Sequence, residues 1–192
     1  MVSVKNAVII HGYHLPNRLA VDGDSPSNSH FLPWLQTQLI ERGILAQTPE
    51  FPLFEGSRYE DWQAVFEAQP LTHKTILVAH SMGGGFLARW LSENDTKFDT
   101  IILVAPWLDV DSESSDPFFN FKLDPNLPNR AKKFMVFASS DDHARINRSV
   151  EFLREKIPNL NVREFDDRKH FRLREMGTRE VPELIEEIFG ES

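Results

Sequence analysis

The stretch that decides the fold is TILVAHSMGGG, residues 75–85. Its first five residues are apolar or β-branched and lack polar alternation, which predicts a strand buried on both faces of a parallel sheet. Residues 83–92 follow directly, and we predict that they form a helix. Ser81 therefore lies in a tight turn between the end of a buried strand and the start of a helix.

Strand and helix signals alternate on both sides of this stretch. Clear strands are predicted at residues 7–10 (AVII), 100–104 (TIILV) and 134–138 (FMVFA), and weaker ones at 44–48 and 161–165. Helices are predicted at 31–42, 57–68, 146–157 and 182–189, and Ser57 with Glu60 suggests a capping box at the start of the second. This alternation predicts a compact α/β fold with a mostly parallel, twisted sheet of about six strands and helices on both faces.

The size of the chain predicts a single domain over residues 1–192. Two stretches rich in Pro, Asp and Ser are expected to lack regular structure: residues 14–29 as a loop, and residues 107–128 as a loop or a short lid. Neither leaves room for a large cap domain. Phe118, Phe119 and Phe121 in the second loop either line an acyl pocket or pack on the core.

Charge and cysteine content narrow the classes of function. The formal net charge is −8 and the basic residues interleave with acidic ones, which disfavours a nucleic-acid binder and mildly disfavours anionic substrates. The chain has no cysteine, which excludes disulfides and a cysteine nucleophile. No signal peptide or membrane-spanning segment is predicted, so we expect a cytoplasmic protein.

Ser81 is the candidate nucleophile. A serine at a strand-to-helix turn with small neighbours is typical of the nucleophile elbow, G-x-S-x-G, with Ala79 here in the place of the first glycine. The alternative is a serine that only caps the helix. In proteins with such an elbow, the acid and then the histidine follow the serine along the chain. His170 fits this order because it follows the last predicted strand. Asp141 or Asp142 would be the acid, and the other is expected to cap the next helix.

An oxyanion hole needs two backbone N–H groups. We expect one from Met82, and the other from the loop after the first strand, where Tyr13 is preferred to His14 and Gly12 permits a close approach. Histidines at positions 11, 14 and 80 lack nearby carboxylates in a helical register, so no metal site is predicted. The glycine run lacks the lysine of a phosphate-binding loop, and no cofactor is expected.

Several motifs together resemble a known family. They are IIHGY (residues 9–13), NSHFLPWL (28–35), EDW (60–62), VAHSMG (78–83), ASSDD (138–142), HF (170–171) and GT (177–178), followed by Pro182. In these the chain resembles the YdeN-like serine hydrolases, which are related to the retinoblastoma-binding-protein hydrolases of the α/β-hydrolase superfamily. The resemblance implies Asp142 as the acid. The family usually has a proline a few residues after the acid and a glycine before the histidine, where this chain has residues 143–146 (HARI) and Lys169.

These observations predict a serine hydrolase that cleaves a carboxylic ester or thioester of a small acyl substrate through an acyl-enzyme. Two alternatives stay open. One is a protein-interaction module that kept the fold and lost turnover. The other is an acyltransferase or amidase that uses the same three side chains.

Overall fold

The computed structural model describes residues 5–13, 25–52, 58–111 and 117–190. Six strands form one sheet in the order β2-β1-β3-β4-β5-β6, and every neighbouring pair is parallel. The strands are β1 (Asn6–Ile10), β2 (Leu45–Gln47), β3 (Ile76–His80), β4 (Phe98–Val104), β5 (Ala131–Ser139) and β6 (Val162–Phe165). The predicted parallel sheet is therefore confirmed, including its two weaker edge strands.

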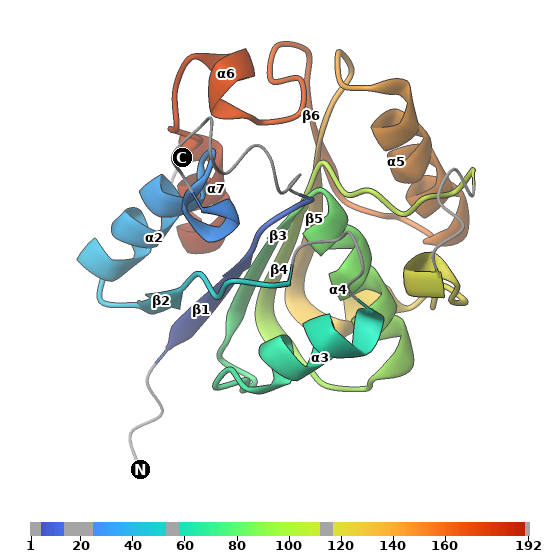
Figure 1. Ribbon diagram of the computed structural model, residues 1–192, viewed down its shortest axis with the longest axis horizontal. Helices are drawn as coiled ribbons and strands as arrows, with labels where there is room; N and C mark the ends of the chain where they lie inside the picture. The colour runs from blue at the N-terminus through green and yellow to red at the C-terminus, as the bar shows by residue number, and fades with distance from the viewer. Residues whose placement is uncertain (1–4, 14–24, 53–57, 112–116, 191–192) are drawn as a thin grey trace.

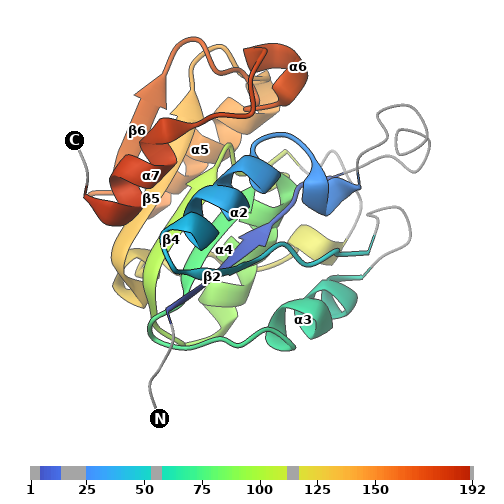
Figure 2. The same ribbon diagram turned by 90° about the vertical axis from the view of Figure 1, so that its left-hand side faces the viewer.

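Helices cover both faces of the sheet (Figure 1). They are α2 (Leu32–Glu41), α3 (Tyr59–Glu67), α4 (Met82–Glu93), α5 (Ala144–Lys156), the one-turn α6 (Leu173–Met176) and α7 (Pro182–Phe189). Leu77 and Ala79 of β3 belong to a core cluster with α3 and α4, whereas Ile76 and Val78 belong to a second cluster with α2 and α7. Figure 2 shows α2 and α7 together on this second face. Burial of alternate residues on opposite faces explains why β3 has no polar alternation.

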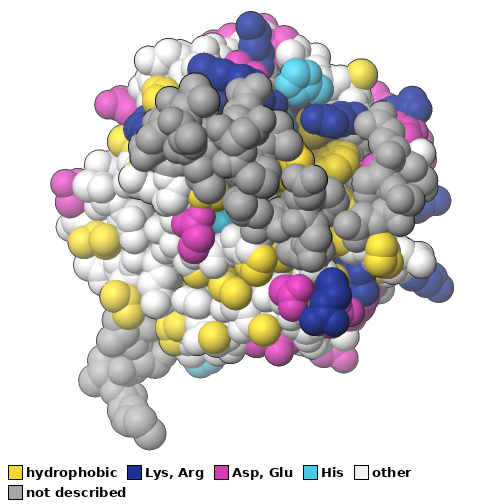
Figure 3. All heavy atoms as spheres, viewed as in Figure 1, with side chains coloured by type: hydrophobic (Ala, Val, Ile, Leu, Met, Phe, Trp, Pro, Cys, Tyr) yellow, Lys and Arg dark blue, Asp and Glu magenta, His cyan; other side chains and the backbone are white. Residues whose placement is uncertain are grey.

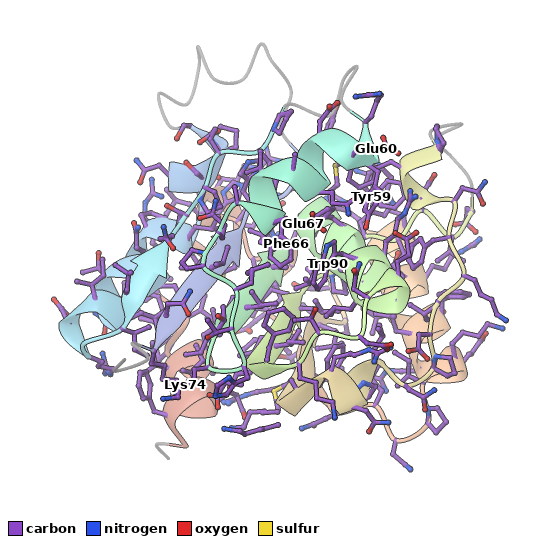
Figure 4. The ribbon with its side chains drawn as sticks, turned by 90° about the horizontal axis from the view of Figure 1, so that it is seen from below. Tyr59, Glu60, Phe66, Glu67, Lys74 and Trp90 are labelled. Carbon is purple, nitrogen blue, oxygen red and sulfur yellow. The ribbon has the colours of Figure 1, made fainter. Side chains whose placement is uncertain are left out.

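The helix α3 begins differently from the prediction. Ser57 lies outside the described residues, and the helix is preceded by Arg58, whose backbone N–H donates to Asp61 Oδ2 at 3.0 Å. The acidic partner of the capping box is thus Asp61 and not Glu60. At its other end α3 is joined to α4, because Trp90 Nε1 donates to Glu67 Oε1 at 2.9 Å (Figure 4).

The position of the site follows from the order of the strands. The chain runs outward from β1 to β2 and then returns to β3 on the other side of β1, so the direction of winding reverses between β1 and β3. Ile10 pairs with Ala79 at the carboxyl ends of these two strands. In open α/β sheets the ligand crevice lies at such a switch point. Gly12 and Ser81, which follow these strand ends, are thereby brought together.

Residues 107–128, predicted to form a loop or lid, are described only in part. Residues 112–116 lie outside the described residues, and a 3-10 turn forms at Pro117–Phe119. Phe118 is buried and contacts the rings of Trp62 and Tyr59, so it packs on the core. No large cap is present in the described ranges.

Among the described residues, no helix has both the length and the apolar character needed to cross a membrane. That residues 1–192 form a single domain stays a prediction.

Candidate active site

Ser81 occupies a strained turn between β3 and α4. Its backbone angles are φ 54° and ψ −120°, a region that side-chain-bearing residues rarely adopt. Hydrogen bonds on both sides hold this conformation: the Ser81 N–H donates to the Val104 carbonyl at 2.9 Å, and the Ser81 carbonyl accepts from Gly84 N at 2.9 Å and Trp107 N at 3.0 Å. The turn is therefore determined by β4 and the segment after it as well as by its own residues.

Two glycines allow β1 to approach this turn. A Cβ on Gly12 would lie 2.8 Å from Ser81 Cβ and 3.2 Å from the His80 carbonyl oxygen. A Cβ on Gly83 would collide with the carbonyl oxygen of His11. The crowding at Gly83 thus comes from the end of β1, the neighbouring strand.

Ser81, His170 and Asp142 form a hydrogen-bonded chain. His170 Nε2 lies 2.9 Å from Ser81 Oγ, and His170 Nδ1 lies 2.9 Å from Asp142 Oδ2. The Asp142 side chain is fully buried and the His170 side chain is 7% exposed. Because a carboxylate only accepts, the proton of a neutral His170 belongs on Nδ1, and the Nε2 lone pair faces the Ser81 hydroxyl. Asp142, and not Asp141, contacts the histidine.

Asp141 does not cap α5, contrary to the expectation for the Asp that is not in contact with His170. The residue before α5 is His143, which makes no side-chain capping bond. Asp141 Oδ1 instead accepts from the backbone N–H of Lys169 at 2.8 Å and from Ser139 Oγ at 2.6 Å. Lys169 has a φ of 45°, so the bond holds a left-handed residue at the position where the family usually has glycine. Asp141 thus anchors the loop that carries His170.

Glu175 and His80 fix the backbone of His170 itself. Its N–H donates to Glu175 Oε2 at 3.1 Å, and its carbonyl lies 2.9 Å from His80 Nε2. Since a carbonyl oxygen only accepts, His80 carries its proton on Nε2. Burial lowers the pKa of His80 well below its ordinary value, which keeps this ring neutral. Sequence reasoning missed this contact, because the two histidines are 90 residues apart.

Burial also controls the charges of the hydrogen-bonded chain. It lowers the pKa of His170, and the positive charge of Arg172 lowers that pKa further. Burial raises the pKa of Asp142. The backbone N–H of His143 donates to Asp142 Oδ1 at 2.6 Å, and this bond lowers the pKa and so offsets part of the rise. A low-dielectric site disfavours the ionised form of both groups. The imidazole is therefore uncharged near neutral pH and can accept a proton at Nε2.

His11 joins the segment after β1 to the backbone at Phe51. Phe51 N–H donates to His11 Nε2 at 2.9 Å, which leaves the ring proton on Nδ1, 2.8 Å from the Gly12 carbonyl oxygen. Tyr13 follows at this edge and is 39% exposed. Met82 is buried at the first position of α4. His14, the alternative to Tyr13, lies outside the described residues.

A small pocket of about 180 Å³ lies in the segment that follows β4. Phe119 and Phe121 line it together with Leu108 and Phe152, and Asp109 adds a carboxyl group. The Phe119 ring also packs on Trp107, with 4.9 Å between the centroids. Two of the three phenylalanines singled out in the sequence thus line a pocket, whereas Phe118 belongs to the core. In the described part of the chain, no three His, Asp or Glu side chains gather as a set that could hold a metal ion.

Comparisons with known proteins agree with this arrangement of strands and turns. A family model described as serine hydrolase matches residues 8–173. YdeN of Bacillus subtilis (strain 168) is 30% identical over 148 residues, which cover 72% of this chain and 71% of YdeN. The crystal structure of the ydeN gene product superposes with a TM-score of 0.81, covering 97% of this chain and 98% of that one at 27% identity.

A more distant structure has the same fold. A YdeN-like protein of Pectobacterium atrosepticum superposes with a TM-score of 0.63 at 15% identity, over 97% of this chain and 90% of its own. The family match covers most of the sheet and includes both Ser81 and His170. The chain therefore belongs to the serine hydrolase family and has the α/β-hydrolase fold.

Proposed function

We propose that this serine hydrolase cleaves a carboxylic ester or thioester of a small acyl substrate, with Ser81 as nucleophile, His170 as base and Asp142 as orienting acid. The observation that carries the proposal is the 2.9 Å distance on each side of the His170 ring, to Ser81 Oγ and to Asp142 Oδ2. Both distances are within the range required for proton transfer and for holding a tautomer.

The first half of the reaction forms an acyl-enzyme. His170 Nε2 takes the Ser81 proton as Oγ attacks the carbonyl carbon, and Asp142 stabilises the imidazolium that results. The carbonyl oxygen becomes an oxyanion, which we assign to the backbone N–H groups of Met82 and Tyr13. The imidazolium then gives its proton to the leaving oxygen or sulfur as the bond to the acyl carbon breaks.

The second half returns the enzyme to its starting state. A water molecule attacks the acyl-enzyme carbonyl while His170 Nε2 takes a proton from it. The second tetrahedral intermediate collapses, the proton passes to Ser81 Oγ, and the carboxylic acid leaves. One oxyanion N–H donor is worth on the order of 10²–10³ in kcat. The reaction as written needs no cofactor.

Labelling with a fluorophosphonate tests the nucleophile. The reagent should attach to the wild type at Ser81 and fail to attach to Ser81→Ala. A folded wild-type protein that forms no adduct would instead favour an interaction module with the same fold. Hydrolysis of p-nitrophenyl butyrate, followed at the released phenolate, then measures turnover.

Product analysis separates hydrolysis from the alternatives that share the three side chains. With p-nitrophenyl butyrate and added glycerol, a hydrolase releases mainly butyrate, whereas an acyltransferase accumulates the glycerol ester. An amidase should also cleave butyryl p-nitroanilide at a rate comparable to that of the ester. Butyrate as the main product, with a slow anilide reaction, is the expected outcome.

A further inference from the structure

Two arginines lie beside the hydrogen-bonded chain of a protein that is acidic overall. The formal net charge is −8, yet Arg172 follows His170 by two residues and Arg145 lies in the first turn of α5. The positive charges of both act on His170. Figure 3 shows dark blue and cyan side chains together at the upper end of the molecule, between the positions of α6 and α5 in Figure 1, with apolar surface beside them. Arg172 and Arg145 thus bring positive charge close to His170.

Arg145 is connected to the nucleophile through Trp107. The guanidinium carbon of Arg145 lies 5.4 Å from the centre of the Trp107 ring. The backbone N–H of Trp107 donates to the Ser81 carbonyl at 3.0 Å. Stacking on an aromatic ring restrains the guanidinium without using its N–H donors. The side chain of Arg145 is therefore restrained on the Trp107 ring, and its hydrogen-bonding fork stays available to a ligand.

The neighbouring charges do not neutralise Arg145. Within the described ranges no acidic side chain pairs with it, whereas Arg148, also on α5, pairs with Asp111 at 2.8 Å. Arg172 is only partly compensated, since it contacts Glu175 at 3.6 Å and points one N–H at His143 Nε2, 3.1 Å away. Two carboxylates beside His170 already have partners: Asp142 pairs with His170, and Asp141 accepts from the Lys169 N–H.

We propose that Arg145 binds a carboxylate carried by the substrate, so that this enzyme prefers esters with an anionic group a few atoms from the scissile carbonyl. The inference rests on the proposed ester hydrolysis and adds the class of ester. A guanidinium fork matches a carboxylate in a bidentate geometry, which a neutral ester cannot use. Arg172 and the positive end of the α5 dipole add to the attraction.

Two matched pairs of esters test this preference. Monoethyl glutarate is compared with ethyl valerate by proton release, which places the carboxylate on the acyl side. The butyryl ester of 4-hydroxybenzoate is compared with the same ester of methyl 4-hydroxybenzoate by absorbance, which places it on the leaving group. In at least one pair the wild type should show the higher kcat/KM for the anionic ester, and added salt should reduce the difference.

Arg145→Gln and Arg148→Gln form matched variants, because they remove the same charge from the same helix. Arg145→Gln should lower the ratio of anionic to neutral kcat/KM about tenfold, mainly through KM, as a lost hydrogen bond between charged groups does. Arg148→Gln should leave the ratio unchanged, and Arg145→Lys should restore part of it.

Two results would overturn the inference in distinguishable ways. If the wild type hydrolyses both members of each pair equally well, or if Arg145→Gln leaves the ratio unchanged, ester hydrolysis stands but the anionic preference is wrong. If no ester is turned over and a fluorophosphonate does not label Ser81, the proposed function fails and the inference fails with it.

Discussion

Replacing Asp141 and Asp142 separately by asparagine tests which carboxylate acts through His170. The two variants lose the same charge at adjacent positions, so each is the control for the other. In Asp142→Asn the His143 N–H, which donates to Oδ1 at 2.6 Å, requires an acceptor and retains the amide oxygen there. The amide NH₂ then takes the place of Oδ2, which lies 2.9 Å from His170 Nδ1.

An NH₂ group at that position can only donate, so His170 must carry its proton on Nε2. That tautomer cannot accept the Ser81 proton. In a characterised Ser-His-Asp protease the same exchange lowers kcat by roughly 10⁴, which corresponds to about 5.5 kcal/mol of transition-state stabilisation. We expect a loss of this order in Asp142→Asn, together with little change in the melting temperature, because the side-chain shape is preserved.

Asp141→Asn should behave in the opposite way. Its Oδ1 can still accept from Lys169 N and Ser139 Oγ, and the side chain is exposed, so the loss of charge costs about 0.5–1 kcal/mol of stability. The melting temperature should fall by about 2–4 °C, and kcat by less than about tenfold because the His170 loop is loosened and not removed.

The assay is kcat for p-nitrophenyl butyrate, with thermal unfolding as the control for folding and the rate of fluorophosphonate labelling as a second readout of Ser81 reactivity. A folded Asp141→Asn variant that loses as much kcat as Asp142→Asn would refute the assignment. An Asp142→Asn variant that keeps most of its activity would refute the argument from the tautomer.

Four further outcomes are expected. Burial lowers the pKa of His170 and raises that of Asp142 to about 7, so the acid limb of kcat/KM for a neutral ester should follow protonation of Asp142 near pH 7, and a plateau that continues to far more acid pH would contradict this assignment. In the free energy of unfolding the two shifts oppose each other as the pH falls, because the folded chain binds the His170 proton less readily and the Asp142 proton more readily than the unfolded chain, so this pair should contribute little net slope between the ordinary pKa values of the two groups. Lys169→Gly removes a left-handed strain of about 1–2 kcal/mol against an entropic cost of about 0.5–1 kcal/mol, so the melting temperature should rise slightly, and a lower value would show that the Lys169 side chain stabilises the loop. Gly12→Ala places a Cβ 2.8 Å from Ser81 Cβ and should cost about 1–3 kcal/mol of stability and most of the ester hydrolysis, whereas unchanged kinetics would mean that the Gly12 segment yields freely.

The sequence by itself determined the architecture and the turn at Ser81. Short, β-branched apolar runs without polar alternation favour strands covered on both faces, and their alternation with helices favours parallel connections. The position of Ser81 between such a run and a helix follows from local pattern alone. The order in which His170 and the Asp pair follow along the chain came from the same reading.

Only the tertiary structure decided how the side chains around His170 are used. Asp141 and Asp142 are adjacent and chemically identical, and the direction of each carboxylate depends on a turn whose partner, Lys169, is far along the chain. The contact from His80 to the His170 carbonyl spans 90 residues, and no periodicity encodes it. Hydrogen bonds between distant segments depend on backbone direction at both ends, and that direction is set only when the sheet has assembled.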